Sequence, residues 1–257
     1  MRNVEKKEVK LKDVSTSSKK KALVYRVIFG CADEIKKDID NYLIDLVFAD
    51  PTKDLTTAKN RIKRFIKTKS DNEKHGIVAE MISHIIIRDE IKMEHLGLLI
   101  NLEDNSMKKG FDGVYQKDND VWFGESKSVY DSDEKHKDNI DEALRCFKNK
   151  INGYATNNPW SNAITHFCRL NNGIKVSDSL RKRIDILSDD FENGVYQDEK
   201  DYNVIPVSTL FIDDNQSFDD ILKDVEKIIS RVSYKQMIVL CIDNDFYNEI
   251  IDYLGGK

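Results

Sequence analysis

Two acidic residues, Asp112 and Glu125, could face each other across a β-hairpin. Two runs rich in Val, Tyr, Phe and Trp surround a polar centre, and the Asp-Asn pair at 118–119 suits the positive φ angles of a tight turn. We therefore expect strands over 110–117 and 120–130. Counting back from the turn along both strands sets Asp112 opposite Glu125, and a four-residue loop would give the same register.

Opposed carboxylates on a covered hairpin need compensating positive charge. Directly opposed residues have β-carbons about 5 Å apart. At an effective dielectric constant of about 20, two like charges at that separation repel by about 3 kcal/mol. Apolar neighbours such as Phe111 and Trp122 predict cover on both faces, whereas on an exposed hairpin water would screen the pair. A covered pair requires a cation or a proton.

A hard divalent metal ion bound through oxygen atoms fits two carboxylates. Lys127 lies two residues after Glu125, so alternation along a strand puts both side chains on one face, while Ser126 points the other way. The ammonium of Lys127 could hold an anion or a water beside the metal. These are the groups that phosphodiester hydrolysis uses.

The same residues resemble the D…ExK core of the PD-(D/E)xK nuclease superfamily. The matching segments are Gly-Phe-Asp-Gly-Val-Tyr at 110–115 and Phe-Gly-Glu-Ser-Lys at 123–127. Phe111 stands where the motif has Pro, a position that varies widely in the superfamily. More narrowly, the region from Gly76 to Lys150 resembles the HamA family, the effectors of bacterial Hachiman anti-phage defence. Glu-x-Lys occurs at four other places in the chain, but only this copy lies in a β-rich run with an Asp on the partner strand.

A helix upstream could add a third carboxylate. Apolar residues at helical spacing predict a helix over Asn72–Ile91. Glu80 follows Gly76 by four residues, a Gly-x-x-x-Glu pattern that nucleases of this kind often carry on the helix before the sheet. The resemblance implies that Glu80 completes an acidic triad with the hairpin pair. The alternative is a flank charge that pairs with His84 one turn later.

The resemblance implies a magnesium-dependent DNA endonuclease with little sequence specificity. Asp112, Glu125 and the backbone carbonyl of Ser126 would ligate Mg²⁺, for which Mn²⁺ could substitute, and Glu80 would hold a second metal or a water. Lys127 would orient the attacking water and offset charge on the transition state. Resemblance to HamA also implies a helicase partner, HamB, that restrains the nuclease. Two alternatives stay open: a non-catalytic interaction subunit that keeps the nuclease fold, and a structure-specific or RNA nuclease.

Basic residues could contact nucleic acid at three places. The formal net charge of −5 argues against a protein that coats DNA by electrostatics alone, but it permits local basic tracks. One such run lies on a helix predicted over Thr56–Lys69, where a solvated face is the alternative to a phosphate-contacting ridge. The candidate nucleic-acid-binding residues are Lys59, Arg61, Lys63, Arg64, Lys67, Lys108, Lys109 and Lys148.

The expected fold is α/β with a restriction-endonuclease-like core of helix, three-stranded meander, helix and strand. A Lys-rich arm or edge segment over 1–21 would precede a single nuclease domain over 22–257, in which 22–70 is an N-terminal extension. The remaining strands are expected over 22–30, 92–102, 204–212 and 236–242, and the remaining helices over 33–49, 136–151, 177–191, 217–232 and 245–254.

Composition limits the class of protein. A length of 257 residues and a hydrophobic content of 40% allow one large α/β domain with a sizeable core. No apolar run approaches the roughly 18 residues that a membrane-spanning helix needs, and the N-terminus lacks a signal-peptide stretch, so we expect a cytoplasmic protein. The four cysteines form no CxxC pair, which favours reduced thiols over a zinc site.

Overall fold

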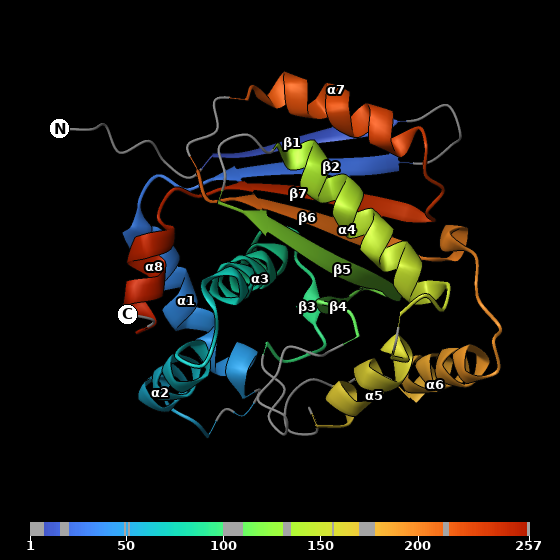
Figure 1. The fold of residues 1–257 in the computed structure, drawn as a ribbon, viewed down its shortest axis with the longest axis horizontal. Coiled ribbons are helices and arrows are strands. Elements are labelled where there is room, and N and C mark those ends of the chain that lie inside the picture. The colour runs from blue at the N-terminus through green and yellow to red at the C-terminus, as the bar shows by residue number, and fades with distance from the viewer. Residues whose placement is uncertain are drawn as a thin grey trace.

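The described chain folds as a mixed β-sheet between two layers of helices (Figure 1). The computed structural model describes residues 8–15, 21–48, 50, 52–99, 110–130, 135–155, 157–169, 178–212 and 216–255. The expected loop over 103–109, with Lys108 and Lys109, therefore lies outside the described residues.

Seven strands form the sheet. They are β1 (Glu8–Ser15), β2 (Lys21–Ile28), β3 (Glu94–His95), β4 (Gly113–Lys117), β5 (Asp120–Val129), β6 (Asn203–Leu210) and β7 (Gln236–Asp243). Their order across the sheet is β1-β2-β7-β6-β5-β4-β3. The four strands β2, β7, β6 and β5 run parallel, and β1, β4 and β3 extend the two edges with antiparallel pairs.

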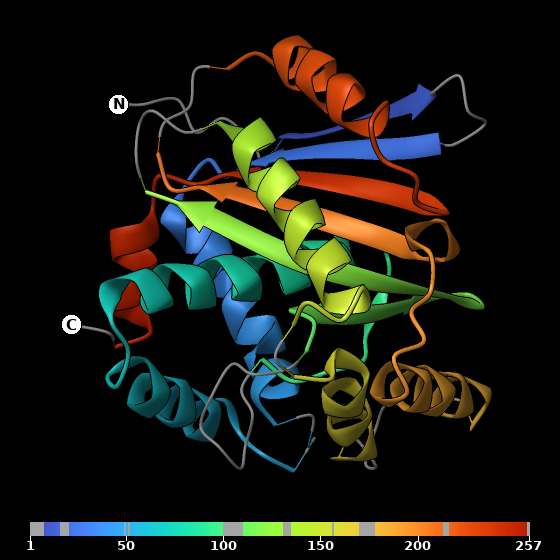
Figure 2. The same ribbon diagram turned by 45° about the vertical axis from the view of Figure 1, so that its right-hand side comes forward.

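Eight α-helices lie in the described parts of the chain. They are α1 (Ala32–Val47), α2 (Leu55–Ile66), α3 (Asp71–Asp89), α4 (His136–Ile151), α5 (Pro159–Arg169), α6 (Asp178–Glu192), α7 (Phe218–Ile229) and α8 (Tyr247–Tyr253). One core joins α1, α2, α3 and α8 to the sheet, and the other joins α4, α5, α6 and α7 to its opposite face. Figure 2 shows α4 crossing in front of β5, β6 and β7, with α3 behind them. Parallel strands need such crossovers, and α4 and α7 supply them between β5, β6 and β7.

Most expected elements are present within three residues of their predicted bounds, and the α/β class is confirmed. The segment expected to be an arm or an edge contains β1, which pairs with β2 at the edge of the sheet. The strand expected over 92–102 is wrong in its extent, because β3 contains only Glu94 and His95. Leu98 and Leu99 are buried outside any strand, and the N–H of Leu99 donates to the carbonyl of Leu46 at the end of α1. An apolar run in a buried loop thus has the same sequence signature as a short strand.

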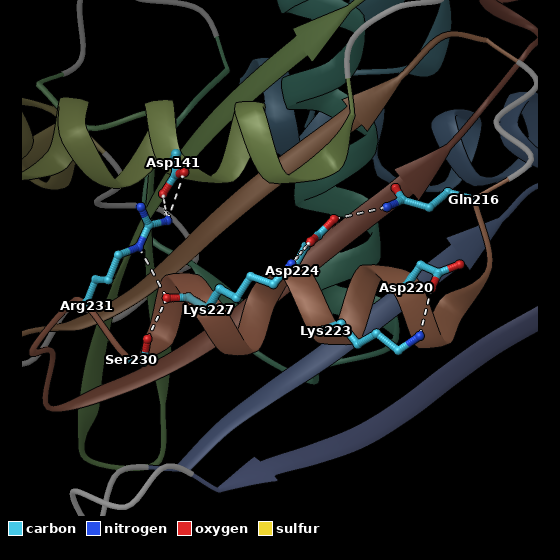
Figure 3. Close-up of polar contacts among 8 residues, drawn as sticks. All are labelled: Asp141, Gln216, Asp220, Lys223, Asp224, Lys227, Ser230 and Arg231. Atoms are coloured by element: carbon cyan, nitrogen blue, oxygen red, sulfur yellow. Dashed lines mark hydrogen bonds and ion pairs between the residues drawn. The ribbon is translucent and has the colours of Figure 1, made fainter.

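A surface ion pair joins α4 to the residue two positions after the end of α7 (Figure 3). Arg231 Nη2 lies 3.2 Å from each carboxylate oxygen of Asp141 on α4. Along α7 itself, Lys227 Nζ lies 2.9 Å from Asp224 Oδ1, and the Ser217 side chain caps the first turn. The polar face of α7 therefore points outward, while its apolar face closes the core over the sheet.

Candidate active site

The hairpin of β4 and β5 has the predicted register. Gly113 pairs with Gly124, so Asp112 comes next along the chain, beside Glu125. The first turn residue has a φ of 54°, as a tight hairpin turn requires. Asp112 Oδ2 accepts a hydrogen bond of 2.8 Å from the N–H of Ser126, which fixes the carboxylate across the hairpin.

Lys150, the penultimate residue of α4, reaches the carboxylate pair. Its Nζ lies 2.5 Å from Glu125 Oε1 and 3.9 Å from Asp112 Oδ1. The exposed fraction of the side chain is 4% for Glu125, 23% for Lys150 and 34% for Asp112. Glu125 is thus closed off, and the pair opens toward solvent on the side of Asp112.

The site holds more negative charge than its own cations offset. Burial and the charge of Asp112 raise the pKa of Glu125 to about 8, although the charges of Lys150 and Lys127 act in the other direction. Burial lowers the pKa of Lys150, but the attraction of Glu125 and Asp112 outweighs burial and leaves that pKa raised. Two neighbouring carboxylates in such surroundings favour a further cation or a shared proton.

Lys127 shares a face of β5 with Glu125 and is turned toward α4. Its charge acts on Cys146 and Glu142 of that helix, as well as on Glu125. Glu142, Cys146 and Lys150 recur every fourth residue, so they form one stripe of α4. This stripe lies over β5. It brings Glu142 near Lys127, and it brings Lys150 into contact with Glu125.

Glu80 lies on the opposite side of the sheet. Helix α3 is buried from Ile77 to Ile87, and Glu80 is buried with it. Glu80 Oε1 lies 3.3 Å from His84 Nε2, and His84 Nδ1 lies 2.6 Å from the hydroxyl of Tyr115. The pairing with His84, one of the two expectations, is therefore present.

Tyr115 fills the space between α3 and the hairpin. A β-carbon on Gly113 would lie 2.4 Å from the Tyr115 hydroxyl, and one on Gly124 would lie 2.9 Å from its ring. These two glycines therefore let the ring lie flat against the sheet. Burial raises the pKa of Tyr115, and the charges of Glu80 and Asp112 add to that effect. Within the described ranges, no three His, Cys, Asp or Glu side chains come together as a possible metal site.

Comparison with known proteins gives the family. A family model named HamA matches residues 3–253. The chain belongs to the HamA family. No curated protein matches the sequence. Membership of HamA makes the chain a protein related to Hachiman defence, a system in which a partner protein is expected.

The candidate DNA contacts of this HamA chain differ in their availability. Lys63 and Arg64 on α2 and Lys67 at its C-cap are exposed, whereas Lys59 lies 2.9 Å from Asp40 and is engaged with it. The remaining candidates are placed as follows: Arg61 is half-buried on α2, and Lys148 on α4 lies 2.9 Å from Glu199. Helix α2 belongs to the layer opposite α4 (Figure 2), so the basic run and Lys150 lie on different faces of the sheet. No helix in the described parts of the chain is long and apolar enough to cross a bilayer.

A second buried charged cluster lies at the other end of α4. Arg26 Nε donates to Asp243 Oδ2 over 2.7 Å, while His136 lies 3.1 Å from Asp243 Oδ1 and 2.8 Å from Ser208 Oγ. Burial alone lowers the pKa of His136, but the Cys241 sulfur and the Asp243 carboxylate outweigh it and raise the pKa to about 10. Burial raises the pKa of Asp243, and bonds from His136 and Arg26 more than reverse this, so that pKa is lowered.

The two clusters adjoin in the sheet. Lys127 on β5 pairs with Ser208 on β6, Ser208 pairs with Cys241 on β7, and Cys241 pairs with Arg26 on β2. Sequence reasoning found neither this row nor the contact of Lys150. The polar stripe of α4 at four-residue spacing was the available signal for Lys150, but no local pattern connects His136 with Asp243.

Proposed function

We propose that this HamA chain is a metal-dependent nuclease that hydrolyses phosphodiester bonds in DNA with little sequence specificity. The carboxylate pair carries the proposal: Asp112 is tied to the Ser126 N–H beside a buried Glu125 whose pKa is raised to about 8. Few structural roles call for two acids in that arrangement, because one of them is held in an unfavourable state until a cation arrives. The order α3, β3 to β5, α4 and β6 supports a restriction-endonuclease-like core.

The donor atoms of the pair fit a magnesium ion. Mg²⁺ is commonly held by one or two carboxylates, with waters and substrate phosphate oxygens completing its ligands. Asp112 and Glu125 supply two carboxylates, and the ammonium of Lys150 already forms ion pairs with both of them. A bound Mg²⁺ or Mn²⁺ would polarise the scissile phosphate and lower the pKa of a coordinated water. The Ser126 carbonyl remains a candidate further ligand.

The surrounding residues have distinct proposed roles. Lys127 orients the attacking water and offsets charge on the transition state; its charge already acts on Glu125. Glu80 lies across the sheet from the carboxylate pair. It could act on a second metal or a water only through its hydrogen-bonded neighbours His84 and Tyr115, or after a movement of α3. Tyr115 of β4 packs on the α3 side of the hairpin and supports it there.

The partner that we infer is a helicase that restrains the nuclease and delivers DNA to it. The Hachiman context of the family supports a partner protein. The net charge of −5 supports a division of labour in which the partner makes part of the DNA contact. The exposed Lys63, Arg64 and Lys67 then form a local contact with DNA or with an acidic surface of the partner.

The test is cleavage of plasmid DNA in Mg²⁺, with the purified chain alone and with a HamB-like helicase added. Glu125→Gln and Lys127→Met should each lower the rate about a hundredfold or more, because each removes a group that acts on the transition state. Asp141→Asn, an exposed change on α4, should leave the rate unchanged. Cleavage at the wild-type rate by Glu125→Gln would contradict the proposal. An inert wild type, alone and with the helicase, would favour a non-catalytic interaction subunit, and cleavage restricted to branched DNA or RNA would favour the other alternative.

A further inference from the structure

We infer that Lys150 is a built-in counter-cation of the carboxylate pair, which occupies the cation position and must swing out before a divalent metal can bind. The inference rests on the proposed function, in which Asp112 and Glu125 are metal ligands. It adds a positioning residue that lies outside the D…ExK motif, on the helix that covers the site.

The distances identify Lys150 as the cation that serves the pair. Its Nζ contacts Glu125 at 2.5 Å and approaches Asp112 to 3.9 Å, so one ammonium spans both acids. Lys127 belongs to the motif, and its charge also acts on Glu125, as well as on Cys146 and Glu142 of α4. Lys150 is the lysine with an ion-pair contact to both carboxylates, and it comes from the covering helix.

Charge balance makes this contact one that a divalent ion would displace. One ammonium approaches both acids, so its attachment depends on their negative charge. A divalent ion would neutralise both carboxylates and would repel an ammonium at the same position. The ion and Lys150 thus compete for the same oxygen atoms.

The position of Lys150 permits such a movement. It is the last residue but one of α4, and the chain turns immediately afterwards at Gly153, which has a φ of 73°. Its side chain is 23% exposed and lies at the open side of the pair, near Asp112. Its Nζ is 5.9 Å from the centre of the buried Phe111 ring, so the ammonium lies at the border between the core and solvent. Rotation about the side-chain bonds of Lys150 would carry the ammonium away from both carboxylates.

Lys150→Met tests the competition, because Met keeps an unbranched apolar stem and removes the charge. If the ammonium holds the site about nine-tenths of the time, its removal should tighten Mg²⁺ binding about tenfold, measured by isothermal titration calorimetry. In chelator, Lys150→Met should also melt at a lower temperature than wild type, and Mg²⁺ should raise its melting temperature by more. Lys137→Met, an exposed change on the same helix, should alter neither quantity.

A second measurement uses the wild-type chain, in case Lys150→Met does not fold. An amine-reactive acetylating reagent should modify Lys150 about tenfold faster when Mg²⁺ is bound, because a lysine displaced from the carboxylates is accessible and loses its proton more readily to give the reactive neutral amine. Lys137 serves as the internal control in the same peptide mass spectra. Equal labelling of Lys150 with and without bound Mg²⁺, or equal affinity of Lys150→Met and wild type, would overturn the inference and leave the nuclease proposal standing. Absence of Mg²⁺ binding in wild type and variant alike would overturn both.

Discussion

The two ends of α4 both rest on buried charged side chains, but the charges are balanced at one end and unbalanced at the other. At the N-terminal end, Asp243 receives bonds from Arg26 and His136, and its pKa is lowered. At the C-terminal end, Lys150 serves two acids, and the pKa of Glu125 is raised to about 8. We call the first cluster balanced because each oxygen of its one acid has a bonded cation, and the second unbalanced because two acids share one bound lysine.

This difference distinguishes a structural cluster from a candidate site. A buried acid with two bonded cations stabilises the fold in the state in which we see it, and nothing further needs to bind. A buried acid with a raised pKa stores an unfavourable interaction that a metal ion can relieve. Helix α4 joins the two clusters. The balanced cluster holds the N-terminal end of the helix in place, and the C-terminal end brings Lys150 to the unbalanced cluster.

The largest expected effect comes from breaking the balanced cluster. Asp243→Asn leaves the charges of Arg26 and His136 buried without their acid, which should cost about 3–5 kcal/mol of unfolding free energy. The measurement is urea denaturation of the purified variant, in which unfolding and refolding are both followed by circular dichroism. A loss below about 1 kcal/mol, the range of an exposed pair, would mean that this cluster does not hold α4 on the sheet.

The corresponding change at the unbalanced cluster should have the opposite sign. Glu125→Gln removes the buried member of two adjacent acids, so it should stabilise the metal-free protein at pH 8, by up to about 2 kcal/mol. The same denaturation measurement in chelator checks it. If Glu125→Gln were less stable than wild type, the negative charge of Glu125 would be as well offset by its neighbours as that of Asp243. The proposed difference between the clusters at the two ends of α4 would then be wrong.

The pH windows of the two clusters sharpen the same comparison. The folded pKa of Glu125, about 8, lies above its ordinary value of 4.5, so its contribution to stability is full below pH 4.5 and is lost as pH rises through 8. The folded pKa of His136, about 10, lies above 6.5, so its contribution is full below pH 6.5 and is lost as pH rises through 10. In chelator, Glu125→Gln should therefore reduce the fall in unfolding free energy between pH 4.5 and 8. His136→Gln should reduce the fall between pH 6.5 and 10.

The sequence determines the hairpin of the site because its information is local. The apolar runs and the turn at 118–119 set the register, and the register sets Asp112 beside Glu125. The contact between His136 and Asp243 joins residues 107 positions apart, and it depends on how α4 and β7 pack after both have formed. Lys150 is an intermediate case. The helix over 136–151 follows from apolar spacing, but which polar stripe lies over β5 follows only from the crossover between β5 and β6.

The smallest effect is expected at the surface pair that joins α4 to α7. Arg231 and Asp141 lie 3.2 Å apart, with half or more of each side chain exposed, so water and salt screen their attraction. Asp141→Asn should therefore change the unfolding free energy by at most about 1 kcal/mol, and less in high salt. Measured beside Asp243→Asn, it separates the effect of burial from that of charge alone, since both variants convert an acid that contacts an arginine into its amide. An equal loss at the two positions would mean that ion pairing in general, and not the buried arrangement at the N-terminal end of α4, fixes the helix on the sheet.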